Sequence, residues 1–157
     1  MFLMQVVFSS CDYVCKSECC NFDCYNGICI EGFCECDLGY EGGECTEVAF
    51  TKFITAQGMA FGDTCSPSAT YPVQIKPGDT ITKLVIDGYL GSVLNATLTD
   101  AAHFSIAPQN IGQDSFTVSG NGYYYSHEPD TNIVVRVFVR RNWIDTVERP
   151  CTFYIKR

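Results

Sequence analysis

The distribution of cysteines constrains this 157-residue chain more than any other feature of its sequence. Nine of the eleven cysteines lie between Cys11 and Cys45, and Cys65 and Cys151 are the only two in the rest of the chain. A segment this short, with few aliphatic residues, cannot bury enough apolar surface to offset the entropy lost on folding, so covalent links must constrain it. We therefore predict three parts in chain order. An apolar strand or tail covers residues 1–10, a cysteine-rich module covers residues 11–45, and a separate domain covers residues 46–157.

Disulfides persist in oxidising compartments, which predicts that the chain is extracellular, either secreted or at the cell surface. Zinc is the competing interpretation for clustered thiols, but the spacings do not form paired C-x2-C units and no histidine lies nearby. No stretch approaches the roughly 20 apolar residues that cross a bilayer as a helix. The first eight residues are too short for a signal peptide and lack a basic segment, so we expect that the secretion signal was removed or never included.

Charge is distributed unevenly along the chain. Residues 1–47 hold nine acidic side chains and one lysine, a net charge of 1 − 9 = −8, while the remaining residues sum to zero. Within that remainder the last strands carry an excess of arginine and lysine. An acidic chain with this polarity is not expected to bind nucleic acid, because phosphate contacts need a broad basic face.

The spacing of six cysteines from Cys20 to Cys45 follows the pattern C-x3-C-x4-C-x4-C-x-C-x8-C, and the last loop reads Gly39-Tyr40-Glu41-Gly42. This segment resembles an EGF-like domain and is closest to the short repeats of the tenascin and teneurin type. The resemblance implies three disulfides, which are Cys20 with Cys29, Cys24 with Cys34, and Cys36 with Cys45. Many EGF-like domains bind calcium just before their first cysteine, but Glu18 is the one carboxylate there, so we predict no metal and no other cofactor.

Three cysteines, Cys11, Cys15 and Cys19, fall outside the EGF-like pattern. Cys65 and Cys151 are expected to bridge across the second module. Three cysteines then remain, and because a disulfide joins two of them, one is left over. One interpretation is an intermolecular disulfide between subunits. The alternatives are a free thiol, or a register in which Cys19 replaces Cys20.

Beyond Cys45, short apolar segments rich in β-branched and aromatic residues alternate with Gly, Pro, Asn and Asp, as in antiparallel strands. Val135, Val137 and Val139 are expected to face one way, with Arg136 and Arg140 facing the other. Strands are predicted near residues 47–55, 71–76, 81–89, 92–99, 103–107, 114–119, 132–141 and 151–156. This pattern favours a mainly β fold with an antiparallel Ig-like β-sandwich, although a jelly roll has similar statistics and the Cys…Trp…Cys signature is absent.

Side chains that could act in catalysis are scarce in this sequence. His103 and His127 have no nucleophile motif around them, so we expect that the chain is not an enzyme. Asn95-Ala96-Thr97 is the only glycosylation sequon and predicts a glycan at Asn95. The tyrosines Tyr123, Tyr124 and Tyr125 are a candidate partner-binding segment, because one or two of them must face outward, and an ordinary strand is the alternative.

The first residues are almost uniformly apolar, and an exposed ordered tail of this kind would be unusual. It either folds back on its own domain or adds as a strand to the sheet of a neighbouring subunit. The candidate contact residues are Phe2, Leu3, Val6, Val7 and Phe8.

The acidic head and basic last strands favour head-to-tail assembly. The leading prediction is an extracellular structural or adhesive module that self-associates into an oligomer or filament through N-terminal strand donation. The alternative is a monomeric ligand-binding ectodomain or secreted recognition factor for another extracellular protein or a glycan.

Overall fold

The structure, a computed structural model, describes residues 23–66, 70–113, 115–127, 130–144 and 147–156. Antiparallel strands dominate these residues, which confirms the prediction of a mainly β, disulfide-rich fold. In order along the chain, the strands are β1 (Gly27–Ile30), β2 (Phe33–Cys36), β3 (Tyr40–Glu41), β4 (Glu47–Val48), β5 (Met59–Phe61), β6 (Thr70–Pro72), β7 (Gln74–Pro77), β8 (Lys83–Tyr89), β9 (Ser92–Leu98), β10 (His103–Ile111), β11 (Phe116–His127), β12 (Asp130–Arg141) and β13 (Arg149–Lys156).

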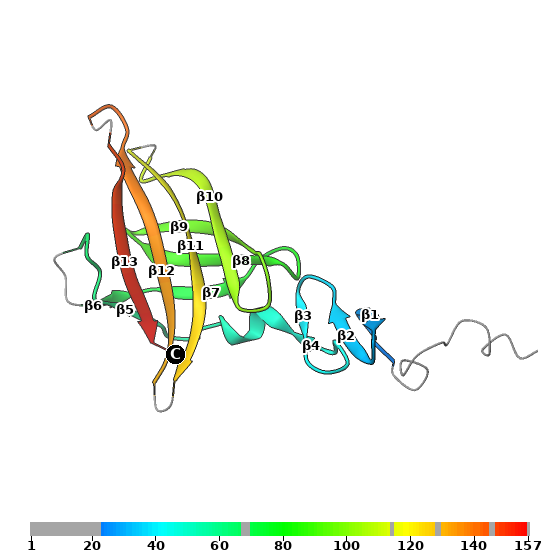
Figure 1. Cartoon of the computed structure of the whole chain (residues 1–157). Helices are drawn as coiled ribbons and strands as arrows, with labels where there is room; N and C mark the ends of the chain where they lie inside the picture. The colour runs from blue at the N-terminus through cyan, green and yellow to red at the C-terminus, as the bar shows by residue number, and fades with distance from the viewer. Residues whose placement is uncertain (1–22, 67–69, 114, 128–129, 145–146, 157) are drawn as a thin grey trace, which may run out of the picture.

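Nine strands form one antiparallel sheet in the order β6-β5-β13-β12-β11-β10-β9-β8-β7. From β7 to β13 each strand pairs with its neighbour in sequence, so this part of the sheet runs up and down without crossovers. The two outermost strands, β6 and β7, are consecutive in the chain and are separated only by Val73. One bent segment therefore pairs with β5 on one side and with β8 on the other, and the sheet curls until it nearly closes (Figure 1).

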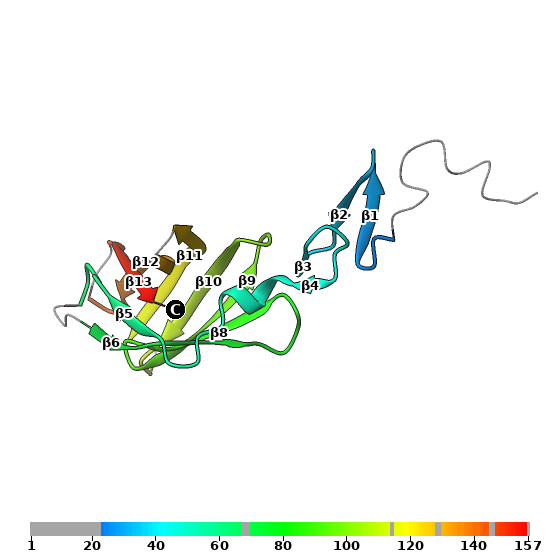
Figure 2. The same ribbon diagram turned by 90° about the horizontal axis from the view of Figure 1, so that it is seen from below.

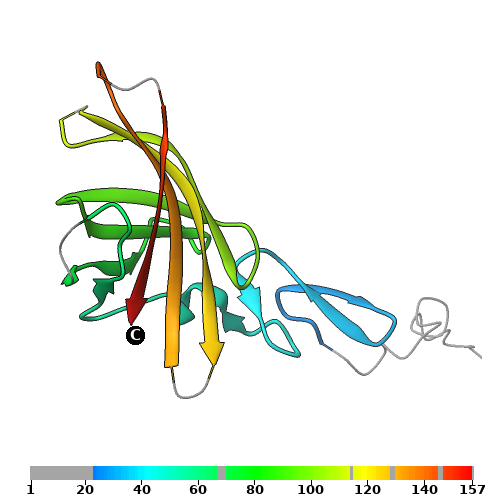
Figure 3. The ribbon, with the colours of Figure 1, turned by 60° about the vertical axis from the view of Figure 1, so that its left-hand side comes forward.

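The sheet is folded into two layers. The long strands β10 to β13 form one layer, and β7 to β9 cross it as a second layer (Figure 1, Figure 3). The strands β9 and β10 share only two register pairs, Leu98 with Phe104 and Thr97 with Ser105, so the sheet turns sharply between them. A register shift in β10 between Ile106 and Gln109 bends that strand further, as bulges do.

This topology differs from the Ig-like sandwich predicted from the sequence. The strands that such a sandwich divides between two separate sheets belong here to one continuous sheet. Alternating apolar residues specify which face of a strand is buried, but they do not specify its neighbours. The two packed layers were therefore predictable, and the way in which they connect was not.

The segment 47–55, predicted as one strand, breaks after the two residues of β4 into the 3-10 turn η2 (Ala49–Lys52). Thr51 Oγ1 donates a hydrogen bond to the carbonyl of Val48 at 2.8 Å, which stabilises the turn. The turn directs Phe53 into the core, where its ring contacts Phe104 edge-on at 5.4 Å between centroids. The prediction of a strand was wrong because this segment ends the cysteine-rich segment and then turns into the core of the nine-stranded sheet.

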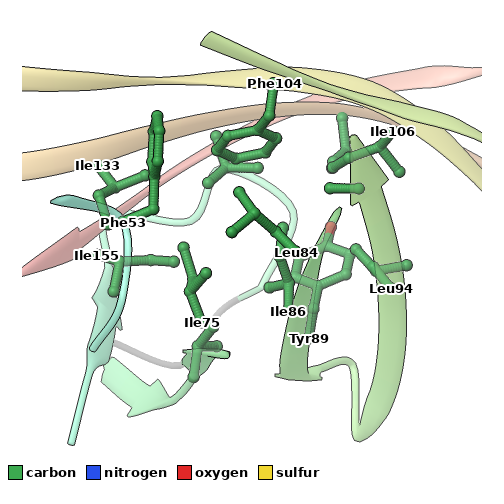
Figure 4. Packing of buried hydrophobic residues seen from close by; sticks show 14 of the residues in the cluster. Phe53, Ile75, Leu84, Ile86, Tyr89, Leu94, Phe104, Ile106, Ile133 and Ile155 are labelled. Atoms are coloured by element: carbon green, nitrogen blue, oxygen red, sulfur yellow. The ribbon is translucent and has the colours of Figure 1, made fainter. Parts of the chain in front are cut away.

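The core fills the space between the two layers with aliphatic and aromatic side chains (Figure 4). Phe53 and Phe104 lie together, with Leu84, Ile86 and Ile75 of the second layer beside them (Figure 4). Further along, the rings of Tyr89 and Phe153 stack at 4.8 Å between centroids. Inward positions of β12 and β13 complete the packing, as the two-residue period of a strand requires: Ile133, Val135 and Val137 from β12, and Cys151, Phe153 and Ile155 from β13.

The cysteine-rich segment projects from one end of the sheet as the β1–β2 hairpin and the short β3–β4 ladder (Figure 2). Three disulfides join described residues, and all three are pairs expected from the sequence: Cys24 with Cys34, Cys36 with Cys45, and Cys65 with Cys151. Cys29 is also disulfide-bonded. Its expected pairing with Cys20, like the expectations for residues 1–10, Cys11, Cys15 and Cys19, lies outside the described residues.

Gly122 tests the packing of the core. A Cβ at this position would lie 2.2 Å from Cζ of Phe104, which is itself fixed against Phe53. We expect Gly122→Ala to lower the free energy of unfolding by about 2 kcal/mol, because an overpacked ring must shift. Chemical denaturation measures the difference, and Gly43→Ala is the control, since a Cβ at Gly43 meets nothing within 4 Å. Equal stability of the two variants would contradict the tight contact.

Candidate partner-binding surfaces

The outer side of the β10–β13 layer presents aromatic and basic side chains. Tyr123, Val134, Tyr154 and Phe61 lie directly opposite one another on four adjacent strands, so they form one row across the sheet. The rings of Phe61 and Tyr154 stack at 5.5 Å between centroids. Val134 is covered by its neighbours in this row. We call the following residues of this outer side the sheet face: Tyr123, Tyr125, Arg136, Phe138, Tyr154 and Lys156.

Positive charge accompanies this aromatic row. The guanidinium of Arg136 lies 5.7 Å from the ring centroid of Tyr123, a cation–π contact that holds both side chains in place. Lys156 is exposed near Tyr154 on the same side of β13. Arg136 and Lys156 therefore give the sheet face a basic character beside its apolar area.

The three tyrosines singled out from the sequence divide between the two sides of β11. Tyr124 faces the core, where its ring meets that of Phe53 at 6.2 Å between centroids. Tyr123 and Tyr125 face outward and belong to the sheet face. The alternation of a strand therefore leaves two of the three tyrosines on the surface, as the sequence allowed.

A second apolar surface lies on the β1–β2 hairpin and was not predicted from the sequence. Ile30 pairs with Phe33 and Ile28 pairs with Glu35, so these four side chains share one side of the hairpin. Phe33 is 79% exposed and Ile28 is 62% exposed. We call Ile28, Ile30, Phe33 and Glu35 the hairpin face. The alternation of Ile28, Cys29 and Ile30 in the sequence indicates two isoleucines on one side of a strand. The cysteine spacing alone predicted the disulfides and gave no reason to expect an apolar face.

The opposite side of the hairpin carries the cysteines that make it rigid. Cys34 and Cys36 alternate with Phe33 and Glu35 along β2, and each of these cysteines is bonded to a cysteine elsewhere in the segment. With the sulfurs on one side, the apolar residues must stand on the other. Residues 23–47 contain seven acidic side chains and no lysine or arginine, so the hairpin face lies in a strongly acidic environment.

The cysteine-rich segment is fixed against the sheet by a short contact region. The N–H of Ala49 donates to the carbonyl of Gly39 at 2.9 Å. Gly39 has a φ of 104° and its Cα approaches Ile81 so closely that an added Cβ would lie 3.1 Å from that side chain. Lys52 forms an ion pair with Glu41 and also lies over the ring of Tyr124. The hairpin face and the sheet face are therefore held in a defined relation to each other.

The turn between β9 and β10 contains a polar cluster centred on Asp100. Asp100 accepts hydrogen bonds from the N–H of Ala102 at 2.8 Å and from Nδ1 of His103 at 2.8 Å. Burial alone would raise the pKa of the Asp100 carboxyl, but the bonds from Ala102 and His103 outweigh it and lower that pKa. The His103 ring lies 5.9 Å from that of Tyr123, at the edge of the sheet face.

The remaining site predictions fall as follows. Asn95 is exposed on β9, in the layer opposite the sheet face, so a glycan there would leave that face uncovered. The side chain of His127 lies outside the described part. Among the residues that the structure describes, no three side chains of the kind that ligate metals come together. No helix in the described part of the chain is long and apolar enough to cross a bilayer.

Comparison of the chain with family models, curated proteins and solved structures finds no match. The resemblance of residues 20–45 to EGF-like repeats therefore stays a prediction. The geometry of the two faces is the basis on which a function can be argued.

Asp100 makes the contribution of the β9–β10 turn to the stability of the fold depend on pH. Because its pKa is lower in the folded state than in the unfolded chain, ionised Asp100 stabilises the fold above the ordinary carboxyl range, and this contribution is lost as the pH falls through the lowered pKa. We expect Asp100→Asn to reduce the thermal midpoint slightly at about pH 7 and to have no effect at about pH 2.

Thermal unfolding followed by circular dichroism at both pH values measures this effect. Asp79→Asn, at an exposed position in the turn between β7 and β8, is the control for removal of one negative charge. A loss of stability in Asp100→Asn that is independent of pH would show that the carboxylate charge is not what stabilises the turn.

Proposed function

We propose that this protein is an extracellular structural or adhesive module that self-associates head to tail, with the hairpin face of one copy packed on the sheet face of the next. The observation that carries this proposal is the complementarity of the two faces. One is apolar and acidic, the other is aromatic and basic, and both are held on rigid elements.

Apolar area supplies the affinity in such a contact, and charge supplies the orientation. Ile28, Ile30 and Phe33 expose enough apolar surface to pack between the outward side chains of Tyr125, Phe138 and Tyr154. Tyrosine and arginine are the residues most often found at the energetic centre of protein interfaces. Glu35 would then face the basic side chains of the sheet face.

Each copy carries both faces, and they lie on different parts of the molecule. A contact between unlike faces is heterologous, so each added copy presents a new face to the next copy. Such a contact produces a ring when the rotation closes and a filament when it does not. Both outcomes suit a matrix or surface layer.

Donation of the N-terminal strand is a less favourable route for assembly through this sheet. Strand addition needs a free sheet edge, and the edge strands β6 and β7 are three and four residues long. Each of them also ends on a proline, Pro72 or Pro77, which cannot donate a backbone hydrogen bond. The apolar residues 1–10 lie outside the described residues, and the proposal does not depend on them.

An extracellular location is part of this proposal. Three disulfides among the described residues indicate an oxidising environment. The EGF-like spacing of residues 20–45 supports the same interpretation, because modules of that kind are assembled with other extracellular domains. We further propose that Asn95 carries a glycan, since it is exposed and lies in a sequon.

The alternative is a monomeric recognition module in which the sheet face binds a different extracellular protein. The arginine and tyrosine content of that face favours it equally. Solution mass separates the two functions, because only the self-associating module changes its mass with concentration.

Exchange of charges between the two faces tests the proposal. Glu35→Lys and Arg136→Glu should each weaken self-association by roughly tenfold at low salt, since an attraction becomes a repulsion. The double variant should recover most of the loss, because the charges are again opposite. Sedimentation velocity over a range of concentrations measures all four proteins.

Glu44→Lys is the matched control, with the same change in net charge at an exposed position outside the hairpin face. It should associate like the parent protein. A parent protein that remains a monomer at every concentration would refute self-association and leave the monomeric recognition module. Equal effects of Glu35→Lys and Glu44→Lys would refute the pairing of these two faces.

A further inference from the structure

His103 stands at the edge of the sheet face, at the start of β10. It lies opposite Tyr123 in the register of β10 and β11, and the two rings are 5.9 Å apart between centroids. The guanidinium of Arg136, on β12, lies 5.7 Å from the centroid of the same tyrosine ring. Any positive charge that His103 gains therefore adds to the basic side of the proposed contact between copies.

Asp100 orients the ring of His103. Its carboxylate lies 2.8 Å from Nδ1 of His103, and it also accepts hydrogen bonds from the N–H of Ala102 at 2.8 Å and from the N–H of His103 at 2.9 Å. An ionised carboxylate only accepts hydrogen bonds, so Nδ1 carries the hydrogen of the neutral imidazole. The second proton, which makes the ring a cation, therefore enters at Nε2.

Only one kind of side chain in these surfaces changes charge near neutral pH. Histidine gains its positive charge between about pH 8 and pH 5. Carboxylates keep their charge until about pH 4, and arginine and lysine stay charged throughout this range. The chain has one other histidine, His127, whose side chain lies outside the described part. The hairpin face therefore stays acidic over an interval in which the edge of the sheet face becomes more basic.

The charged groups near His103 belong to the free copy and to the assembled copy alike. On the elements that adjoin His103, the titratable and charged groups are Asp100 of the turn, Tyr123 of β11, Arg136 of β12, Lys83 of β8, and Asp37, Glu41 and Lys52 of the segment that leads into the sheet. Glu41 is paired with Lys52, and Lys83 donates to the hydroxyl of Thr97 at 2.7 Å. Since these groups are present in both states, a difference between the states must come from the acidic side chains of a neighbouring copy.

We infer that His103 makes the head-to-tail assembly respond to pH. The imidazolium form strengthens the packing of the hairpin face of one copy on the sheet face of the next, and loss of the proton weakens it. This inference rests on the proposed function and names the regulation of that contact.

The direction of the effect follows from where the proton is bound more tightly. In a free copy the His103 ring is exposed at the edge of the sheet face, whereas in the assembly the acidic hairpin of a neighbour lies close to it. Association then takes up a proton, so it strengthens as the pH falls from about 8 to 5 and weakens again below about pH 4, where the carboxylates lose their charge. A unit charge about 8 Å from an opposite charge in a partly hydrated contact changes the association constant by about threefold.

Sedimentation velocity of the full chain at about pH 7.5 and about pH 5.8, at one low ionic strength, measures this response. The parent should associate about threefold more tightly at the lower pH, and His103→Gln should lose this gain because its side chain cannot take up the proton. His103→Arg, which carries a permanent charge, should associate at the higher pH as the parent does at the lower pH.

His127→Gln is the matched control, because it removes the only other histidine of the chain and should keep the response of the parent. The chain carries a net charge of −8, so general repulsion between copies also declines as the pH falls. That contribution is the same in the two glutamine variants. At about 0.5 M salt the difference between the two pH values should nearly vanish, since the charges are screened. Circular dichroism at both pH values checks that each variant is folded.

The outcomes separate this inference from the proposed function. A parent that associates equally at the two pH values overturns the response to pH and leaves the contact between the faces intact. A gain that persists in His103→Gln, or that is lost in His127→Gln, also overturns the assignment to His103. A parent that is monomeric at both pH values refutes the contact itself, and the regulation with it.

Discussion

The bend at Val73, between β6 and β7, is the constraint on which the rest of the structure depends. One segment bends at this residue, and its two halves pair with the two ends of the sheet, through β5 and β8. Backbone hydrogen bonds continue across the bend, where the N–H of Val73 donates to Gly58 and the N–H of Thr55 donates to Ile75. Because the two ends of the sheet are joined in this way, the nine strands enclose one core.

Closure of the sheet limits the routes by which the proposed self-association can occur. A nearly closed sheet cannot gain much from an added strand, so the proposal assigns the contact to side chains on its outer surface. Phe53, which fills one end of the core, follows directly after the ladder that ends the cysteine-rich segment. The same short stretch therefore completes the core and fixes the acidic hairpin against the sheet.

The proposed contact between copies combines two physical means. The hairpin face and the sheet face each expose apolar area, which supplies affinity, and they carry opposite charge, which supplies orientation. Both faces stand on elements held by disulfides or by the sheet, so little conformational entropy is lost when they meet.

Much of the strand content followed from side-chain alternation. Val135 and Val137 are buried and Arg136 and Arg140 are exposed, as their spacing required. The three disulfides between described residues also match the expected pairs. Less could be predicted where a residue departs from its neighbours' pattern, as at Phe53, whose place in the core depends on Phe104, fifty-one positions away in sequence (104 − 53). The hairpin face was missed because its apolar residues alternate with cysteines.

The sequence alone determined that the first module needs disulfides, that the second is built from antiparallel strands, and that acidic and basic residues are segregated along the chain. These properties depend on composition and on the two-residue period of a strand, which are local. The tertiary structure alone decided that one sheet nearly closes on itself, and that Arg136 of β12 and Lys156 of β13 lie beside exposed tyrosines on one outer face. Strand neighbours and the bend at Val73 arise from packing between distant residues, and no local pattern encodes them.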